Sequence, residues 1–338
     1  MLRWISKSGT FIQFTIFTVI LAVMWIPAFL NPLLPVQTSS DGPLYTLIVS
    51  WLQQNALLSV AIALTLIILQ SFILFYVFQA NGFFKRSNFL PAIIILLAYS
   101  WNSDFQTMHA ALPATLFIII ALNSIMGMYG KQGAYQEVFI AAFSIGMASL
   151  FYIPLAFLLL MIWFTFITYR ISSWREYAVS IIGYILPFIY YISWLFWNDN
   201  VRNGLTHLSG SLINLILPPR ISVINTIWLS ASAFIMIVAM FAVLNVMSDK
   251  LISVRRRSWV LFNFSFTALV AILVAGWPIL SANYLFVIPL SFFLTGSFTL
   301  IKRPFWFEML ALAYLLLLIS IRIYLVFPVI GYWVGLKV

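Results

Sequence analysis

The chain lacks cysteine altogether and has few charged residues. No cysteine occurs among its 338 residues, which excludes disulfides, thiol catalysis and cysteine-ligated metals. Its two histidines, His109 and His207, are too few for a multi-histidine metal cage. Only 7% of the residues are charged and 64% are hydrophobic, whereas a soluble domain has about 25% charged residues. The sequence therefore cannot cover the surface of a soluble fold.

The hydrophobic residues form long unbroken runs. Strands of an outer-membrane barrel alternate in polarity over about 10 residues, so this pattern excludes a barrel, and it fits helices that cross a bilayer with about 20 apolar residues each. We predict an all-α, polytopic helical membrane protein that forms one integral membrane domain over residues 1–338. About eleven spans are expected, over residues 11–30, 56–80, 88–103, 110–128, 136–151, 154–170, 177–197, 223–246, 259–277, 281–300 and 306–328.

Two apolar stretches are too long to be single upright helices. Val138 to Tyr169 contains 32 residues without a charge, and as one helix it would measure about 48 Å, against a hydrocarbon core of about 30 Å. It is therefore either a hairpin or one steeply tilted helix. Trp259 to Ile301 is expected to hold two spans, with the turn at Trp277-Pro278.

The positive charges favour the hairpin. With hairpins in both stretches, 13 of the 17 lysines and arginines lie on one side, namely Arg3, Lys7, Lys85, Arg86, Lys131, Arg170, Arg175, Lys250, Arg255, Arg256, Arg257, Lys302 and Arg303. Arg202, Arg220, Arg322 and Lys337 remain on the other side. A single helix would change this split to 9 and 8. Basic residues collect in cytoplasmic loops, so the N-terminus is expected inside and the C-terminus outside. The net charge of +10 is explained in the same way, without a nucleic-acid partner.

Six of the seven acidic residues divide into two groups, and the seventh, Asp249, lies beside Lys250 in a basic loop. Glu137, Glu176 and Glu308 lie at predicted helix starts, where a negative charge is stabilised by the helix dipole. Asp41, Asp104 and Asp199 lie in predicted outer loops, together with both histidines. For Asp199, within Asn198-Asp199-Asn200, a solvated loop is a sufficient explanation.

Asp41 and Asp104 each have two interpretations. Asp41 precedes Gly42-Pro43 and a segment, 44–53, that mixes apolar and polar residues. It is either the N-cap of an amphipathic interfacial helix or a functional carboxylate. Asp104 lies in Trp101–His109, after a predicted helix C-terminus where the dipole disfavours an anion. Asp104 is therefore either a solvated loop residue or a functional carboxylate.

The predicted spans are almost free of ionisable groups, and Arg322, near the outer end of 306–328, is the exception. Intramembrane charge indicates function by default, and the alternative is that the side chain extends to the membrane surface. The lack of buried acids argues against a proton- or sodium-coupled pump. No Gly-rich phosphate loop, GxSxG or HExxH motif occurs.

Two resemblances follow from these residues. Asp41, Tyr45 and the apolar run Leu44 to Leu52 are similar to the first outer loop of the GT-C superfamily of glycosyltransferases, in which an acidic residue precedes an amphipathic helix. Asp104 and His109 match that superfamily's second acidic or histidine-bearing outer loop. The whole chain also resembles an uncharacterised family of polytopic inner-membrane proteins of Gram-negative bacteria, through Ser144 to Pro154 and Ser173-Trp174-Arg175-Glu176. These resemblances imply a bacterial inner-membrane location.

The GT-C resemblance implies sugar transfer from a polyprenyl-phosphate-linked donor at the outer, periplasmic face. Asp41 would be the general base, and Asp104 or His109 would orient the acceptor or bind a divalent cation. The donor's phosphate would be bound by Arg322, Arg202 and Arg220, with His207 and Tyr45 in the same binding site. The alternative is a non-catalytic protein, either a lipid-carrier translocator or an assembly partner in an envelope-biogenesis complex. Membrane lipids are partners in every case.

Overall fold

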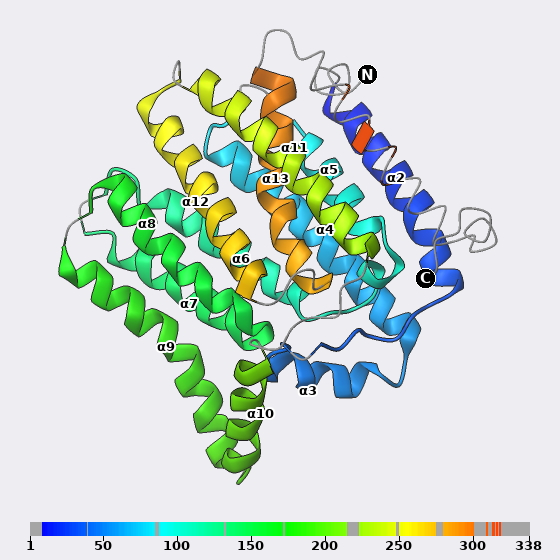
Figure 1. The fold of residues 1–338 in the computed structure, drawn as a ribbon, viewed down its shortest axis with the longest axis vertical. Helices are drawn as coiled ribbons and strands as arrows, with labels where there is room; N and C mark the ends of the chain where they lie inside the picture. Colours follow the sequence, from blue (N-terminus) through cyan, green and yellow to red (C-terminus); the bar gives the residue numbers. More distant parts are fainter. Residues whose placement is uncertain are drawn as a thin grey trace.

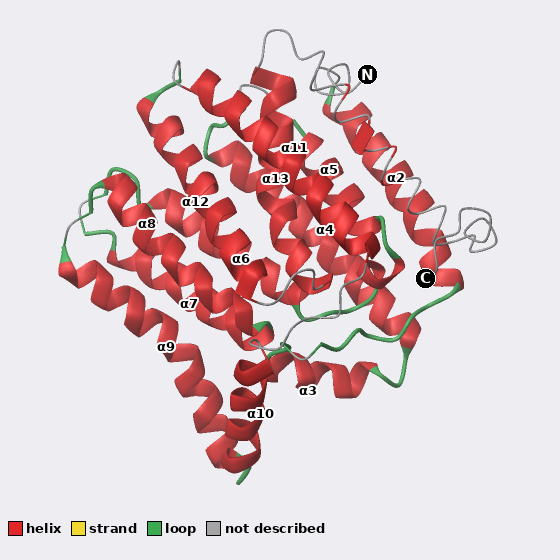
Figure 2. Cartoon of the chain, in the orientation of Figure 1, coloured by secondary structure: helices red, strands yellow, loops and turns green. Residues whose placement is uncertain are grey.

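The computed structural model describes residues 9–38, 40–84, 88–131, 133–171, 173–214, 223–247, 250–274 and 280–300, with isolated positions from 309 to 318. Every regular element in these residues is a helix (Figure 2), and one isolated antiparallel bridge pairs Asp41 with Tyr152. The prediction of an all-α protein is confirmed for this part of the chain.

Four helical segments in the described chain are long and apolar enough to cross a membrane. They are α2 (Thr10–Leu30), α4 (Ala56–Ala80), α9 (Trp174–Trp197) and the segment Thr226–Met247 of α11 (Val223–Met247). Shorter or more charged helices complete the bundle: α5 (Leu90–Ser100), α6 (Ala111–Gly127), α7 (Tyr135–Phe151), α8 (Leu159–Tyr169), α12 (Ile252–Val274) and α13 (Leu280–Leu300). The described chain therefore has the helices of a membrane protein.

Two elements differ from the sequence-based expectation. Helix α12 begins at Ile252, seven residues before the predicted start. Its first turns contain Arg255, Arg256 and Arg257, and arginine is a good helix former although it is not apolar. Helix α10 (Val201–Asn214) lies in a segment predicted to be a loop. The predicted last span, 306–328, lies outside the described residues except for isolated helical positions.

The stretch Val138–Tyr169 is two helices and not one. Tyr152 has an extended backbone, with φ −141° and ψ 104°, and a 3-10 helix, η2 (Ile153–Leu158), leads into α8. Pro154 has no backbone N–H and disfavours helical geometry in the residue before it, so α7 cannot continue through this point. Helix α8 then packs against α7.

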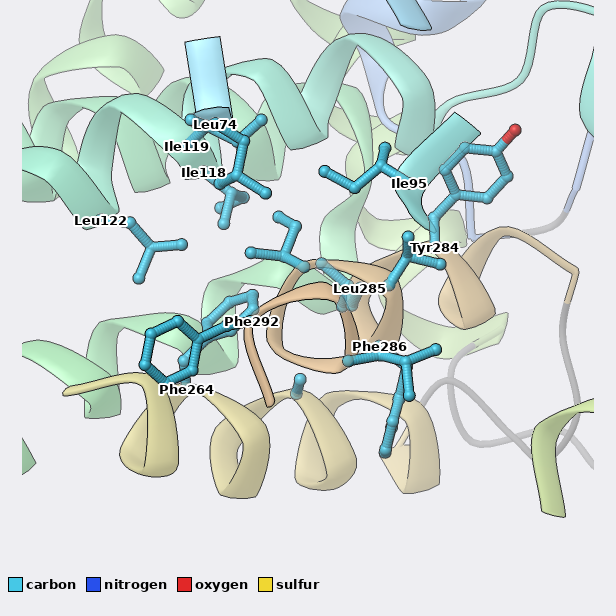
Figure 3. Packing of buried hydrophobic residues seen from close by; sticks show 14 of the residues in the cluster. Leu74, Ile95, Ile118, Ile119, Leu122, Phe264, Tyr284, Leu285, Phe286 and Phe292 are labelled. Carbon is cyan, nitrogen blue, oxygen red and sulfur yellow. The ribbon is translucent and has the colours of Figure 1, made fainter. Parts of the chain in front are cut away.

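Helix α13 is the centre of the described bundle. Leu285, Val287, Leu290 and Phe293, which point in different directions around the helix, are all fully buried. Figure 3 shows α13 surrounded by side chains of α4, α5, α6 and α12, including Leu74, Ile95 and Phe264. A helix that is apolar on all sides is stable only in such an environment.

One end of the bundle is covered by two short helices. Helix α3 (Pro43–Leu52) runs crosswise to the long helices, and α10 lies beside it at the lower end of the view (Figure 1). Helix α3 buries Tyr45, Val49 and Leu52, while Leu47 and Trp51 remain exposed. A helix follows Asp41 as predicted, with one face buried, and this arrangement places the candidate site.

Candidate functional site

The two loops that carry the predicted site residues are joined to each other through Tyr45. Its single hydroxyl hydrogen is shared between the carbonyl oxygens of Val36, at 2.7 Å, and Met108, at 2.9 Å. The backbone N–H of Val36 also donates to the Met108 carbonyl, at 2.9 Å. A second connection runs from the Thr107 hydroxyl to the Leu33 carbonyl at 3.0 Å. The Asp41 loop and the Asp104–His109 loop therefore form one packed layer at this end of the bundle.

The Asp41 carboxylate does not cap helix α3, so that interpretation of the sequence was wrong. The N-cap residue is Gly42, and no side chain caps the helix. The carboxylate instead accepts hydrogen bonds from the backbone N–H of Thr38 at 2.7 Å and from the Thr38 hydroxyl. Asp41 precedes the N-cap residue, and its side chain turns back to Thr38, three residues earlier.

The backbone on either side of Asp41 is fixed against the break between α7 and η2. The N–H of Gly42 donates to the Phe151 carbonyl at 2.7 Å, and the N–H of Ile153 donates to the Ser40 carbonyl at 3.3 Å. The approach at Gly42 is so close that a Cβ atom there would lie 2.1 Å from the Leu150 carbonyl oxygen. The Ser211 hydroxyl of α10 donates to the Asp41 carbonyl at 3.2 Å. Two distant segments, the α7–η2 break and α10, thus hold this residue.

Asp41 is a buried carboxylate without a basic partner in the described part of the chain. Its side chain is 4% exposed, and the carboxylate accepts its hydrogen bonds from Thr38. Burial raises its pKa from 3.8 to about 6, although the hydrogen bonds from Thr38 oppose this rise. Burial, with a contribution from the Asp41 charge, also raises the pKa of Tyr45 above its usual range. Asp41 can therefore take up and release a proton near neutral pH.

His109 is a neutral imidazole among aromatic rings. It is 1% exposed, and its ring centroid lies 4.1 Å from that of Tyr284 and 6.2 Å from that of Phe105. Neither ring nitrogen has a hydrogen-bond partner among the described residues. Burial lowers the pKa of His109 to about 3, so the side chain carries no charge at neutral pH.

Asp104 is half-buried in the first turn of the 3-10 helix η1 (Ser103–Gln106). Its backbone N–H donates to the Asn102 side chain at 3.2 Å, and burial raises the pKa of its carboxyl group. The described residues contain no group of three or more histidines and acidic residues that could hold a metal ion. A cation bound by Asp104 and His109 stays a prediction.

Arg202 is the predicted phosphate-binding arginine that lies in the described part of the chain. Arg202 is exposed in the first turn of α10, nine residues before Ser211, which is about 14 Å along the helix axis. The backbone of His207 lies in α10 between them, but its side chain is outside the described residues. Arg220 and Arg322 also lie outside the described residues.

Sequence reasoning missed two residues that hold Asp41. The spacing of Thr38 and Asp41 is that of a local side-chain-to-backbone turn and could have indicated the first. Ser211 lies 170 residues from Asp41 along the chain, and no local pattern identifies it.

No known protein family, curated protein or solved structure matches this chain.

Proposed function

We propose that this protein is a membrane glycosyltransferase that uses a polyprenyl-phosphate-linked sugar at the outer face of the bacterial inner membrane. The observation that carries the proposal is the buried Asp41 carboxylate, which has no basic partner among the described residues and a pKa near 6. A general base is most effective when its pKa lies near the working pH. Asp41 also lies directly before the crosswise helix α3 (Figure 1).

In this proposal Asp41 removes the proton from an acceptor hydroxyl. The acceptor oxygen attacks the anomeric carbon of the donor sugar, and the bond from that carbon to the phosphate oxygen breaks. The lipid phosphate leaves with the bonding electron pair. Arg322, Arg220 and Arg202, with His207, bind this phosphate, since guanidinium groups pair with phosphate oxygens.

Asp104 and His109 have the supporting role. The neutral imidazole of His109 has one donor and one acceptor nitrogen for an acceptor molecule. A divalent cation would be held by these two side chains and would supply positive charge at the site. The proposal includes about eleven spans in a GT-C-like arrangement, with the N-terminus in the cytoplasm and the C-terminus in the periplasm, as the positive charges favour.

One observation favours the non-catalytic alternative. Both oxygens of the Asp41 carboxylate already accept hydrogen bonds from Thr38, so this side chain also stabilises its own loop. A lipid-carrier translocator or an assembly partner in an envelope complex would need that structural role alone.

The Asp41→Asn variant distinguishes the glycosyltransferase from the non-catalytic alternative. The purified protein is reconstituted in lipid nanodiscs and supplied with a panel of polyprenyl-phosphate-linked sugars and candidate acceptors. Loss of a general base is expected to reduce turnover by about 100-fold or more, with the thermal unfolding temperature retained. Asp199→Asn is the matched control, because Asp199 is exposed and has a φ of 52° that asparagine adopts readily. Full turnover in Asp41→Asn would contradict the proposal.

A further inference from the structure

The basic first turns of α12 pack against the ends of two other helices. Arg256 Nη1 donates to the carbonyl oxygen of Thr168, near the end of α8, at 2.6 Å. Asn263, two turns further along α12, donates to the Thr168 hydroxyl at 3.2 Å. Arg257 Nη1 lies 3.5 Å from the carbonyl oxygen of Asn81, which ends α4. The negative ends of the α4 and α8 dipoles stabilise these arginines.

Two buried hydrogen-bond donors at this place have no partner among the described residues. They are Nε of Arg257 and the hydroxyl group of Tyr169, the last residue of α8. Arg256 and Thr168, the chain neighbours of Arg257 and Tyr169, are hydrogen-bonded to each other, and the Tyr129 ring lies 5.4 Å from that of Tyr169. Buried donors in proteins are normally satisfied, so two unpaired donors at one helix contact indicate a missing acceptor.

Among the residues that the structure describes here, the positive charges also lack paired carboxylates. In the described part of the chain, no carboxylate forms an ion pair with Arg255, Arg256 or Arg257. The carboxylate of Glu137, in the first turn of α7, pairs with Lys131 instead. Neutral carbonyl groups are the partners of Arg256 and Arg257. An acceptor that carries negative charge and more than one oxygen atom would satisfy Arg257 and Tyr169 together.

We propose that Arg257 and Tyr169, with Arg256 beside them, bind a phosphate-type anion where α4, α6, α8 and α12 meet. The fork of Arg257 would contact phosphate oxygens through Nε, and the Tyr169 hydroxyl would donate to the same group. This site is separate from Asp41 and belongs to the end of the bundle predicted to face the cytoplasm. The same chemistry is presented by an anionic lipid headgroup and by free phosphate.

The test uses the full chain, delipidated in a neutral detergent. Inorganic phosphate is titrated in one arm and short-chain phosphatidylglycerol in the other, and the shift in thermal unfolding temperature gives the apparent Kd. Stabilisation by phosphate alone assigns free phosphate, and stabilisation by the lipid alone assigns the headgroup. No stabilisation of the wild type in either arm would overturn the proposal.

Three variants locate the anion. Arg257→Gln is expected to weaken binding about tenfold or more, and Tyr169→Phe about tenfold. Without an anion, Tyr169→Phe should unfold at no lower temperature than the wild type, because its hydroxyl then has no partner to lose. Arg255→Gln is the matched control, since it removes the same charge two residues away. If Arg255→Gln weakened binding as much as Arg257→Gln, general surface charge would explain the result and the site would be rejected.

Discussion

At the residue scale, Tyr45 is one of the side chains that connect the Asp41 loop with the Asp104–His109 loop. Its hydroxyl is buried between the Val36 and Met108 carbonyl groups, each from a different loop. We expect Tyr45→Phe to lower the free energy of unfolding by about 1–2 kcal/mol, because the Val36 carbonyl is left without a donor. The Met108 carbonyl keeps its hydrogen bond from Val36 N–H.

Denaturant unfolding in detergent measures this change. Tyr76→Phe is the control, since Tyr76 on α4 is 68% exposed and should change stability little. Equal stability of the Tyr45→Phe variant and the wild type would show that the two loops are held together by other contacts.

Single residues were predictable from the sequence where the signal is local. Asp41 was identified as a candidate because a charge is rare in this chain, but its N-capping role was wrong, since the carboxylate bonds to Thr38. The environment of His109 could not be predicted. Its neighbour Tyr284 is 175 residues away, and only the packing of α13 brings the two rings to 4.1 Å.

At the element scale, the close approach of Gly42 to the end of α7 fixes the Asp41 loop. We expect Gly42→Ala to lower the free energy of unfolding by about 3 kcal/mol, because the added Cβ would meet the Leu150 backbone at 2.1 Å. Gly210→Ala on α10 is the control. No atom lies within 4 Å of its added Cβ, and alanine should stabilise the helix by about 1 kcal/mol. Equal thermal unfolding temperatures for the two variants would contradict this contact.

Helix positions followed closely from the hydrophobic runs. The spans predicted at 11–30 and 56–80 correspond to α2 and α4 within a residue. Helix α10 was missed because its leucines are separated by polar residues such as Asn203, Thr206 and Ser209, and such a pattern does not predict a membrane span.

At the scale of the whole molecule, the central prediction is which end of the bundle faces outward. The chain has no cysteine, so single cysteines can be introduced without background labelling. Asn203 on α10 and Gln136 on α7 are both exposed. We expect a membrane-impermeant maleimide to label Asn203→Cys in intact spheroplasts and Gln136→Cys only after permeabilisation. The reverse pattern would contradict the orientation derived from the positive charges.

The arrangement of the helices in space could not be predicted from the sequence. Composition predicts that the regular elements are helices, because each span must bury its backbone in a helix. Which helix is central depends on packing between segments far apart in the chain. Helix α13 has a hydrophobic run much like those of its neighbours, yet it is the helix buried on all sides in the described bundle.

The most direct test of the central claim is the pH dependence of kcat/KM for sugar transfer. Asp41 must be deprotonated to act as a base, and burial places its pKa at about 6. For the wild type, kcat/KM should therefore rise about tenfold per pH unit below pH 6 and level off above it. The Asp41→Asn variant should bind the donor normally. Its kcat/KM should lose this pH dependence, and its turnover should fall about 100-fold or more. An unchanged profile with full turnover in Asp41→Asn would contradict the claim that Asp41 is the general base.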